Sequence, residues 1–454
     1  MNSINPATGE VLASFEASTE KEVEHAVQKA RKAVPVWSSL SIDERCSYVR
    51  EFLKKLRSSK KEFAELITKE MGKAIKESED EIEGAVADME WFLSATRDAV
   101  EPENTGLKQK GMAGHIFFEP VGVVGVITPW NFPLGTPIWK VIPALLTGNT
   151  LVFKPSELST LCSDKIHALF EAAGLPKNVM NMARGGGSIG KILVESSVDM
   201  ISFTGSSAAG KDVYSRASAG MKKVVLELGG SDPFIAFGDA PLNSVVKTAV
   251  FGRFFNCGQV CTAAKRILVQ REIFEDFVDG FVKEAGKLKV GDPLDRKTDV
   301  GPLVSGKQLE TLEGQVKDAI SKGVKLLLGG KRLPGKGFFY EPTVLSQVKP
   351  GMRVFEEEVF GPVASIMPFN GKEDAIRIAN SNQYGLGASV WTRNMELAEE
   401  VASRLEAGMV WINDFGTPYP QCPQGGMKAS GFGREMSIYG IREFCRMKTV
   451  VRSP

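Results

Sequence analysis

The sequence predicts an α/β protein made of two successive units, each built on a mainly parallel β-sheet. From residue 121 onward, short apolar runs rich in β-forming residues alternate with helical patterns. These runs are apolar on both faces, as in parallel sheets that helices cover on both sides. The chain has 454 residues, whereas a single hydrophobic core stops growing near about 250 to 300. We therefore expect more than one domain, with a cleft between domains for a ligand.

The first unit should consist of amino-terminal helices followed by alternating strands and helices. Long charged amphipathic patterns fill much of the first 100 residues, at 21–37 and 43–56 for example, and we expect these helices to cover one face of the first sheet. Strands joined by right-handed crossovers should follow, at residues 121–128, 149–155, 178–183, 200–205 and 222–230. Helices are expected between them, around 138–146, 163–174 and 209–220.

A second α/β unit is expected to start near residue 229. Its strands should lie at 232–237, 267–273, 322–330, 338–345, 363–369, 385–393 and 409–414. Helices are expected ahead of Cys261 and at 274–290 and 394–408. Two strand-like runs far from these units, 106–120 and 447–454, need partners, which a neighbouring subunit could supply.

Composition excludes several classes of partner. The chain carries 56 Lys and Arg against 55 Asp and Glu, so it has no field to recruit nucleic acid or an anionic membrane. Its longest apolar run, 121–128, is far shorter than the ~18 residues that span a bilayer. The amino terminus lacks a signal-peptide pattern and the cysteines are scattered, which favours a soluble cytoplasmic protein with reduced thiols. We therefore expect a small-molecule ligand.

The stretch FFNCGQVCTAAKR, residues 254–266, contains the candidate nucleophile Cys261. Its x3 spacing from Cys257 does not suit zinc, and the three histidines of the chain lie far from it in sequence, so no metal is expected. The two thiols would share a helical face, yet Gly258 and Gln259 suggest a bend that exposes a backbone amide. Such an amide can donate to an oxyanion. Simple packing of a buried cysteine remains the alternative.

Asn131 and Glu227 each end a buried strand and carry groups suited to carbonyl chemistry. Asn131 lies between two prolines, where its amide can donate to a ligand, although an Asx turn would explain it equally well. Glu227 interrupts an apolar strand, and burial would raise its pKa toward the range of a general base. Exposure at the strand end is the alternative.

Other polar positions suit a nucleotide. Residues 201–211 form a strand followed by small residues and a helix start, a weak signal for pyrophosphate because the spacing is not G-x-G-x-x-G. Lys154 and Glu157 follow another strand and could bind ribose hydroxyls. Glu358 and Phe360 precede a Gly-Pro turn, in a charge run that could equally be solvated surface.

Seven motifs together resemble the aldehyde dehydrogenase superfamily over essentially the whole chain: PWNFP, KPSE, FTGS, LELGG, GQVC, EEVFGPV and GFGRE, in that order. The resemblance is strongest to short bacterial and archaeal succinate-semialdehyde dehydrogenase-like enzymes. It implies a Rossmann-type NAD(P)-binding domain at 1–100 and 121–228 and an α/β catalytic domain at 229–423. It also implies a small β extension, 101–120 and 436–454, that joins subunits into a homodimer or homotetramer.

The resemblance further implies catalytic roles. Cys261 would attack an aldehyde to form a thiohemiacetal, with the oxyanion held by the Asn131 side chain and the Cys261 N–H. Glu227 would activate the water that hydrolyses the resulting thioester, and Lys140 and Glu435 would form a proton relay behind it. The cofactor would be NAD, with NADP as an alternative. It would be held by Thr128, Trp130, Lys154, Ser156, Glu157, Gly205, Ser206, Glu358 and Phe360.

The substrate is less defined by the resemblance. The positions implied to line its tunnel are Phe132, Trp139, Phe255, Thr262 and Gln424. Trp139 and Phe255 stand where related enzymes specific for succinate semialdehyde often carry arginines, and Arg253 is a candidate anchor. We expect succinate semialdehyde or a range of aldehydes, with a glyceraldehyde- or lactaldehyde-type specificity as the alternative.

Rival functions are disfavoured by particular residues. An acylating enzyme that uses coenzyme A would usually lack Glu227, and an inactive binding protein need not keep Cys261, Asn131 and Glu227 together. A cysteine hydrolase needs a histidine partner, and His167 has no motif around it. Cys257 either packs as a small residue or forms a disulfide with Cys261 under oxidation.

Overall fold

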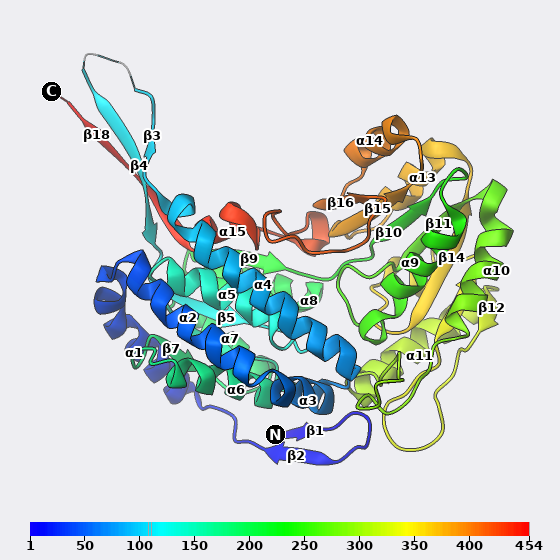
Figure 1. The fold of residues 1–454 in the computed structure, drawn as a ribbon, viewed down its shortest axis with the longest axis horizontal. Coiled ribbons are helices and arrows are strands. Elements are labelled where there is room, and N and C mark those ends of the chain that lie inside the picture. Colours follow the sequence, from blue (N-terminus) through cyan, green and yellow to red (C-terminus); the bar gives the residue numbers. More distant parts are fainter. Residues whose placement is uncertain (108, 110, 454) are drawn as a thin grey trace.

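The computed structural model describes residues 1–107, 109 and 111–453, which form two α/β lobes and a β arm (Figure 1). One lobe contains a six-stranded sheet and the other a seven-stranded sheet. The arm is a three-stranded sheet that extends from the first lobe. A short hairpin of β1 (Asn2–Ile4) and β2 (Val11–Ser14) lies at the amino terminus. No helix in the described part of the chain is long and apolar enough to cross a membrane.

The first sheet confirms the expected strands. Its order is β17-β9-β8-β5-β6-β7. All neighbours are parallel except β17, which runs antiparallel to β9 at one edge. The strand bounds are β5 (Val123–Ile127), β6 (Thr150–Lys154), β7 (Met180–Met182), β8 (Met200–Thr204), β9 (Lys223–Glu227) and β17 (Gly431–Phe432).

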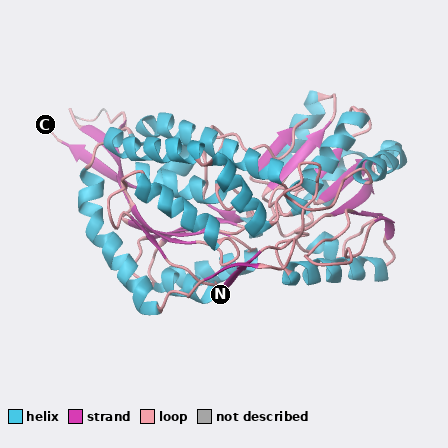
Figure 2. Cartoon of the chain, turned by 60° about the horizontal axis from the view of Figure 1, so that its bottom comes forward, coloured by secondary structure: helices cyan, strands magenta, loops and turns pink. Residues whose placement is uncertain are grey.

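Helices cover both faces of this sheet, as Figure 2 shows from below. On one face lie α1 (Glu20–Ser39), α7 (Gly187–Glu195) and α8 (Ser207–Ser218). The other face is covered by α2 (Ile42–Ser58), α3 (Lys60–Met71), α4 (Ile75–Val100), α5 (Gly135–Leu146) and α6 (Thr160–Ala172).

The expectation that all amino-terminal helices share one face is therefore wrong. Side chains alternate along β5, so Val123 and Ile127 pack with α1 while Val124 and Val126 pack with the α2 side. The apolar stripe of α1, which includes Val23, completes the core opposite α2, α3 and α4. The first lobe thus has a core on each side of its sheet.

The second sheet has the order β12-β13-β14-β11-β10-β15-β16, parallel except for β12. Its strands are β10 (Pro233–Ala236), β11 (Arg266–Gln270), β12 (Lys325–Leu328), β13 (Thr343–Ser346), β14 (Val363–Phe369), β15 (Gly387–Trp391) and β16 (Met409–Ile412). Its helices are α9 (Leu242–Phe254), α10 (Phe274–Ala285), α11 (Gly306–Ser321), α12 (Arg353–Glu356), α13 (Gly371–Asn380) and α14 (Met395–Arg404).

The two expected strands of the β arm have partners within the same chain, where a neighbouring subunit was considered as one source of them. After α15 (Ser437–Glu443), β18 (Cys445–Arg452) runs antiparallel to β4 (Ala113–Pro120), and β3 (Glu103–Asn104) pairs with the other edge of β4. The two strands far apart in sequence are thus partners of each other. Residues 108, 110 and 454 of the expected extension lie outside the described residues.

Residues 424–435 leave the second lobe and return to the first sheet. Gln424 and Glu435 form a backbone bridge, with each N–H donating to the other residue's carbonyl at 2.8 Å. Between them, Gly431 of β17 lies opposite Glu227 at the end of β9. The carboxyl end of β9 is thereby enclosed by chain from both lobes.

Candidate active site

Cys261 lies in a loop created by an abrupt end of α9. The helix stops at Phe254 and a short 3-10 turn, Phe255–Gly258, follows. Asn256, Cys257 and Gly258 have φ values of 51°, 54° and 69°, in the left-handed region that ends a right-handed helix. A Cβ on Gly258 would lie 2.3 Å from the Gly361 carbonyl oxygen, so a side chain does not fit there. The expected bend is confirmed, so Cys257 and Cys261 do not share a helical face.

Buried hydrogen bonds fasten this loop to both lobes. The Asn131 amide Nδ2 donates to the Gln259 carbonyl at 3.0 Å, and Asn256 Nδ2 donates to the Asn131 carbonyl at 3.0 Å. Gln259 Oε1 in turn accepts from the Val304 N–H at 3.0 Å. Asn131 Nδ2 carries two hydrogens, so one N–H can donate to Gln259 while the other serves a ligand.

The two cysteines of the loop have different surroundings. Cys257 is 2% exposed and belongs to the apolar core of the second lobe, whereas Cys261 is partly exposed. Burial raises the pKa of the Cys261 thiol to about 12, and the nearby Lys265 ammonium opposes that rise. Among the described residues, no group of three or more His, Cys, Asp or Glu side chains could hold a metal ion.

Glu227 is a buried carboxyl at the carboxyl end of β9. It is 8% exposed, and its Oε1 has no hydrogen-bond partner among the described residues. Burial raises its pKa well above the usual range, and the neighbouring Glu435 carboxylate raises it further. Behind it, the buried side chains of Lys140 and Glu435 form an ion pair, and Lys140 Nζ also donates to Ser202 Oγ at 3.3 Å.

Polar groups on the first lobe form a surface suited to a dinucleotide. This surface, called the cofactor seat, consists of Lys154, Glu157, Thr204, Gly205 and Ser206. Lys154, at the end of β6, is 5% exposed, and its Nζ lies 3.8 Å from Glu157 Oε2. Burial lowers the pKa of Lys154, while Glu157 raises it. Thr204 Oγ1 is buried with no hydrogen-bond partner in the described chain. Gly205 follows it, and Ser206 caps the start of α8 by accepting from the Ala209 N–H at 3.3 Å.

These groups fit the chemistry of a nucleotide cofactor. An ammonium and a carboxylate side by side suit ribose hydroxyls, and a capped helix start next to a glycine suits a pyrophosphate. Two other expected cofactor residues, Thr128 and Ser156, are buried at the strand ends beside this seat. The Thr128 N–H donates to the Lys154 carbonyl at 3.3 Å.

The second lobe faces this seat with Glu358 and Phe360. Glu358 Oε1 accepts from Lys265 Nζ at 3.0 Å and from the Gly230 N–H at 3.1 Å. The Phe360 ring meets the Trp130 ring edge to face, with centroids 5.6 Å apart. Side chains from both lobes thus contact one another across the expected cofactor seat.

Two of the expected substrate residues stack on each other, and a third binds a buried acid. The rings of Phe132 and Phe255 stack with centroids 6.3 Å apart. Trp139 Nε1 donates to Asp88 Oδ2 at 2.6 Å, and burial raises the pKa of Asp88 to about 6. Thr262 follows Cys261 and is partly exposed, while Gln424 is buried beside Glu435.

Arg253 does not serve as an anchor for a substrate carboxylate. It is completely buried, and its Nη2 donates to the carbonyls of Gly258, Val359 and Gly361. Burial lowers its pKa to about 10. Its guanidinium therefore supports the Cys261 loop from beneath.

An acidic face of α4, which the sequence patterns did not single out, supports the site walls. Glu77 accepts from the Asn256 N–H at 3.0 Å, and Glu81 accepts from the N–H groups of Leu134 and Gly135 at the start of α5. Glu77, Glu81 and Asp88 share this face because they are spaced by 4 and 7 residues. The spacing of these three acids along a helix could be predicted from the sequence. The loops whose N–H groups donate to Glu77 and Glu81 could not.

Comparison with known proteins decides the family. A model described as the aldehyde dehydrogenase family matches residues 1–450. The chain belongs to the aldehyde dehydrogenase family. This confirms the enzyme class that the seven motifs predicted.

Relatives of the enzyme include both succinate semialdehyde and betaine aldehyde dehydrogenases. Betaine aldehyde dehydrogenase from Bacillus subtilis (strain 168) is 40% identical over 99% of this chain and 93% of the relative. A succinate semialdehyde dehydrogenase [NAD(P)+] from Escherichia coli (strain K12) is 38% identical over 99% of this chain and 97% of the relative. The expected resemblance to succinate semialdehyde dehydrogenases is thus confirmed, alongside an equally clear one to betaine aldehyde dehydrogenases.

Solved structures confirm the fold. A crystal structure of betaine aldehyde dehydrogenase from Staphylococcus aureus in complex with NAD+ superposes with a TM-score of 0.97 at 35% identity. The match covers 100% of this chain and 94% of that chain. Both α/β lobes and the β arm of this aldehyde dehydrogenase are therefore those of the family.

Proposed function

We propose that this aldehyde dehydrogenase oxidises its substrate to a carboxylic acid through a covalent intermediate on Cys261. One arrangement carries the proposal. A partly exposed thiol lies on a loop fastened by Asn131, and the buried carboxyl of Glu227 lies close enough for its charge to raise the pKa of that thiol. A nucleophile, an amide donor and a base with a raised pKa are the groups that acyl chemistry requires.

Each residue has its own role in the proposed oxidation. The partly exposed Cys261 thiol loses its proton to solvent water, and its Sγ bonds to the aldehyde carbon while the carbonyl π electrons move to the oxygen. The second N–H of Asn131 and the Cys261 N–H donate to this oxyanion. After oxidation to the thioester, Glu227 takes a proton from water, whose oxygen attacks the acyl carbon and releases the acid and the Cys261 thiolate. Lys140 and Glu435 lie behind Glu227 and can pass that proton on.

The proposed cofactor is NAD, which when bound supplies a ring that accepts hydride. Lys154 and Glu157 would hold the adenosine ribose, Gly205 and Ser206 the pyrophosphate, and Glu358, Phe360 and Trp130 the nicotinamide side. The Glu157 carboxylate supports NAD because it would repel the 2′-phosphate of NADP. Relatives support either cofactor, since the Staphylococcus enzyme is in complex with NAD+ and the Escherichia coli relative is named for NAD(P)+.

We propose a range of uncharged and cationic aldehydes as substrates rather than succinate semialdehyde alone. Phe255 and Trp139 are aromatic at positions where related enzymes specific for succinate semialdehyde often carry arginines. Arg253 is completely buried, and its Nη2 donates to three backbone carbonyls. Asp88 places a carboxyl behind the indole of Trp139. Aromatic faces and a nearby acid favour a cation and disfavour an anion.

Initial rates across an aldehyde panel test this proposal. The panel includes succinate semialdehyde, betaine aldehyde, an aminoaldehyde, glyceraldehyde, lactaldehyde and benzaldehyde, each with NAD and with NADP. We expect kcat/KM for succinate semialdehyde to be the lowest or near it, and Phe255→Arg to raise it about 10-fold relative to benzaldehyde. A preference of about 100-fold for succinate semialdehyde in the wild type would contradict the proposed substrate range.

Two further assays address the rival function and assembly. Added coenzyme A should not change the rate, because Glu227 activates water as the acyl acceptor.

The β arm is proposed to join copies into a homodimer or homotetramer, since Met447, Val450 and Val451 of β18 are exposed apolar side chains on an edge strand. Light scattering of Val450→Lys should show smaller particles than the wild type, and an unchanged mass would contradict the role of the arm.

A further inference from the structure

Lys265 is a fully buried lysine beneath the nucleophile that the roles above do not use. It is the fourth residue after Cys261, and its side chain is 0% exposed. Its Nζ donates to the Cys261 carbonyl at 2.5 Å and to Glu358 Oε1 at 3.0 Å. One ammonium thus binds the backbone of the nucleophile in the loop and the carboxylate that faces the cofactor seat.

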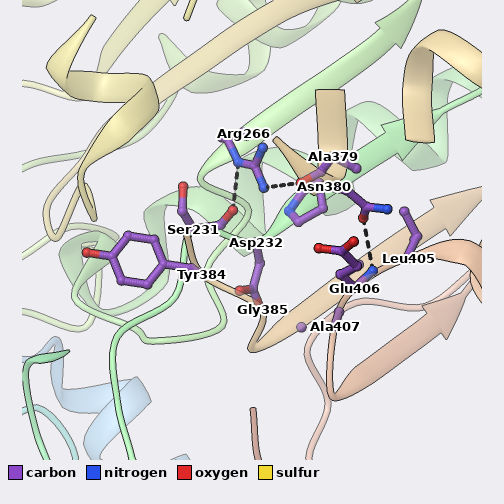
Figure 3. A pocket seen from close by; sticks show the side chains of 13 residues that line it. Ser231, Asp232, Arg266, Ala379, Asn380, Tyr384, Gly385, Leu405, Glu406 and Ala407 are labelled. Carbon is purple, nitrogen blue, oxygen red and sulfur yellow. Dashed lines mark hydrogen bonds between the residues drawn. The ribbon is translucent and has the colours of Figure 1, made fainter. Parts of the chain in front are cut away.

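The adjacent Arg266 does not share this task. Its Nε donates to the Ser231 carbonyl at 2.8 Å and one terminal nitrogen donates to the Ala379 carbonyl (Figure 3). The other terminal nitrogen donates to the Ile378 carbonyl at 2.9 Å. The buried Asp232 lies nearby, with no hydrogen-bond partner for either carboxylate oxygen among the described residues. The guanidinium is therefore occupied by backbone carbonyls, whereas the neighbouring Lys265 pairs with the carboxylate of Glu358.

We propose that Lys265 is a positioning residue that couples the reactivity of Cys261 to the cofactor seat. Its charge favours the thiolate of Cys261, and its bond to Glu358 fixes that carboxylate toward the seat. The proposal rests on the proposed roles of Cys261 and Glu358. It adds a residue that touches neither substrate nor cofactor and acts through both groups.

The charges around the thiol support this role. Burial raises the pKa of Cys261, Lys265 lowers it, and Asp232, Glu358 and Glu227 raise it further. The ammonium therefore opposes three carboxyl groups that all disfavour the thiolate. Removing it while leaving the carboxyls should make the thiol harder to ionise.

Two measurements on purified Lys265→Met test the coupling. The first is the rate of Cys261 alkylation by iodoacetamide across about pH 7 to 11, read by peptide mass spectrometry so that the exposed Cys422 is counted separately. At each pH below the midpoint, we expect the alkylation rate of Lys265→Met to be about 10-fold lower than that of the wild type. This corresponds to a rise of about one unit in the pKa of Cys261. The second is NAD affinity by calorimetry, where we expect the Kd to rise about 3- to 10-fold because Glu358 loses its partner.

Matched variants separate charge from packing. Lys265→Arg should recover most of the alkylation rate because it keeps the charge. Lys154→Met should weaken NAD binding while leaving the alkylation profile unchanged, since Lys154 lies on the other lobe. Glu358→Gln should move the profile in the opposite direction, toward lower pH, and it tests the same coupling if Lys265→Met does not fold.

The proposal is overturned by either of two results. One is an alkylation profile of Lys265→Met equal to that of the wild type, and the other is an equal loss in Lys265→Met and Lys265→Arg, which would show that shape and not charge matters. Alkylation requires no aldehyde oxidation. A failure of the proposed substrate range would therefore leave this test intact.

Discussion

Glu227 and Glu358 are two carboxyl groups near the same thiol, held in opposite ways. Glu227 ends a strand of the first sheet, is buried, and has an oxygen with no partner among the described residues. Glu358 belongs to the second lobe and accepts from both Lys265 and the Gly230 N–H. The raised pKa of Glu227 suits a group that exchanges a proton, whereas the two hydrogen bonds to Glu358 fix the position of its carboxylate. From this contrast we propose that Glu227 moves protons and that Glu358 holds a ligand in place.

The substitution Glu227→Gln should have the largest effect, which is on kcat. The amide cannot take a proton from water, so we expect kcat to fall about 10²- to 10⁴-fold. Acylation should survive, and stopped-flow absorbance should still show a burst of NADH close to one per active site. Loss of the burst in proportion to turnover would show that Glu227 acts before the thioester forms and would remove the contrast.

Glu358→Gln should act on binding instead of turnover. Replacing the paired carboxylate removes a charge-assisted hydrogen bond, so the KM for NAD should rise about 10- to 100-fold. The effect on kcat should be several-fold smaller than that of Glu227→Gln. Steady-state kinetics with NAD varied at saturating aldehyde measure both, and a variant with normal KM and strongly reduced kcat would reverse the two assignments.

Glu435→Gln sharpens the contrast by changing the surroundings of Glu227. The Glu435 carboxylate raises the pKa of Glu227, and the Lys140 ammonium lowers it. Without the Glu435 charge, the pKa of Glu227 should fall. The acid limb of kcat, where Glu227 becomes protonated, should then move to lower pH, with a change of a few-fold in rate at acidic pH. A kcat profile that keeps its position would mean that another group sets the limb.

The smallest expected effect is on stability against pH. The pKa of Glu227 is raised by burial, so its stabilising contribution is complete below the unfolded pKa and is lost as pH rises through the folded pKa. Glu227→Gln does not ionise, so its Tm should exceed that of the wild type at alkaline pH by about 2 °C or more and match it at acidic pH. Differential scanning fluorimetry from acidic to alkaline buffers checks the sign; a difference that shrinks as pH rises would contradict it.

Much of the fold could be predicted because its signals are local. Strands β5, β6 and β8 are continuous apolar runs, and their parallel pairing follows from the helices between them. The assignment of α1 to the same face as α2 was wrong because two amphipathic helices look alike in sequence, and only the alternation along β5 decides which face each one covers. The pairing of β4 with β18 links residues too distant in sequence to leave a local pattern.

The candidate active site was also only partly predictable from the sequence. The positions of Cys261, Asn131 and Glu227 could be read from their motifs, and burial of Glu227 follows from the apolar strand around it. Lys265 could not be singled out, because a lysine four residues after a cysteine has many uses until its Nζ is seen against Glu358. The roles of Glu77 and Glu81 are equally hidden, since each one satisfies backbone N–H groups of a distant segment.

The return of residues 424–435 to the first sheet sets the order in which the enzyme is completed during translation. Domains fold largely from the amino terminus as the ribosome releases them, so strands β5 to β9 of the first sheet can pair while β17 and Glu435 are still in the exit tunnel. Until β17 pairs with β9, Glu227 lacks the segment that encloses it. A nascent chain thus carries the proposed nucleophile Cys261 before it has the segment that encloses Glu227. A chain ended shortly after residue 423 would lack the buried ion pair behind Glu227, and it would also lack Met436, Ile441 and Phe444 of the first lobe's core.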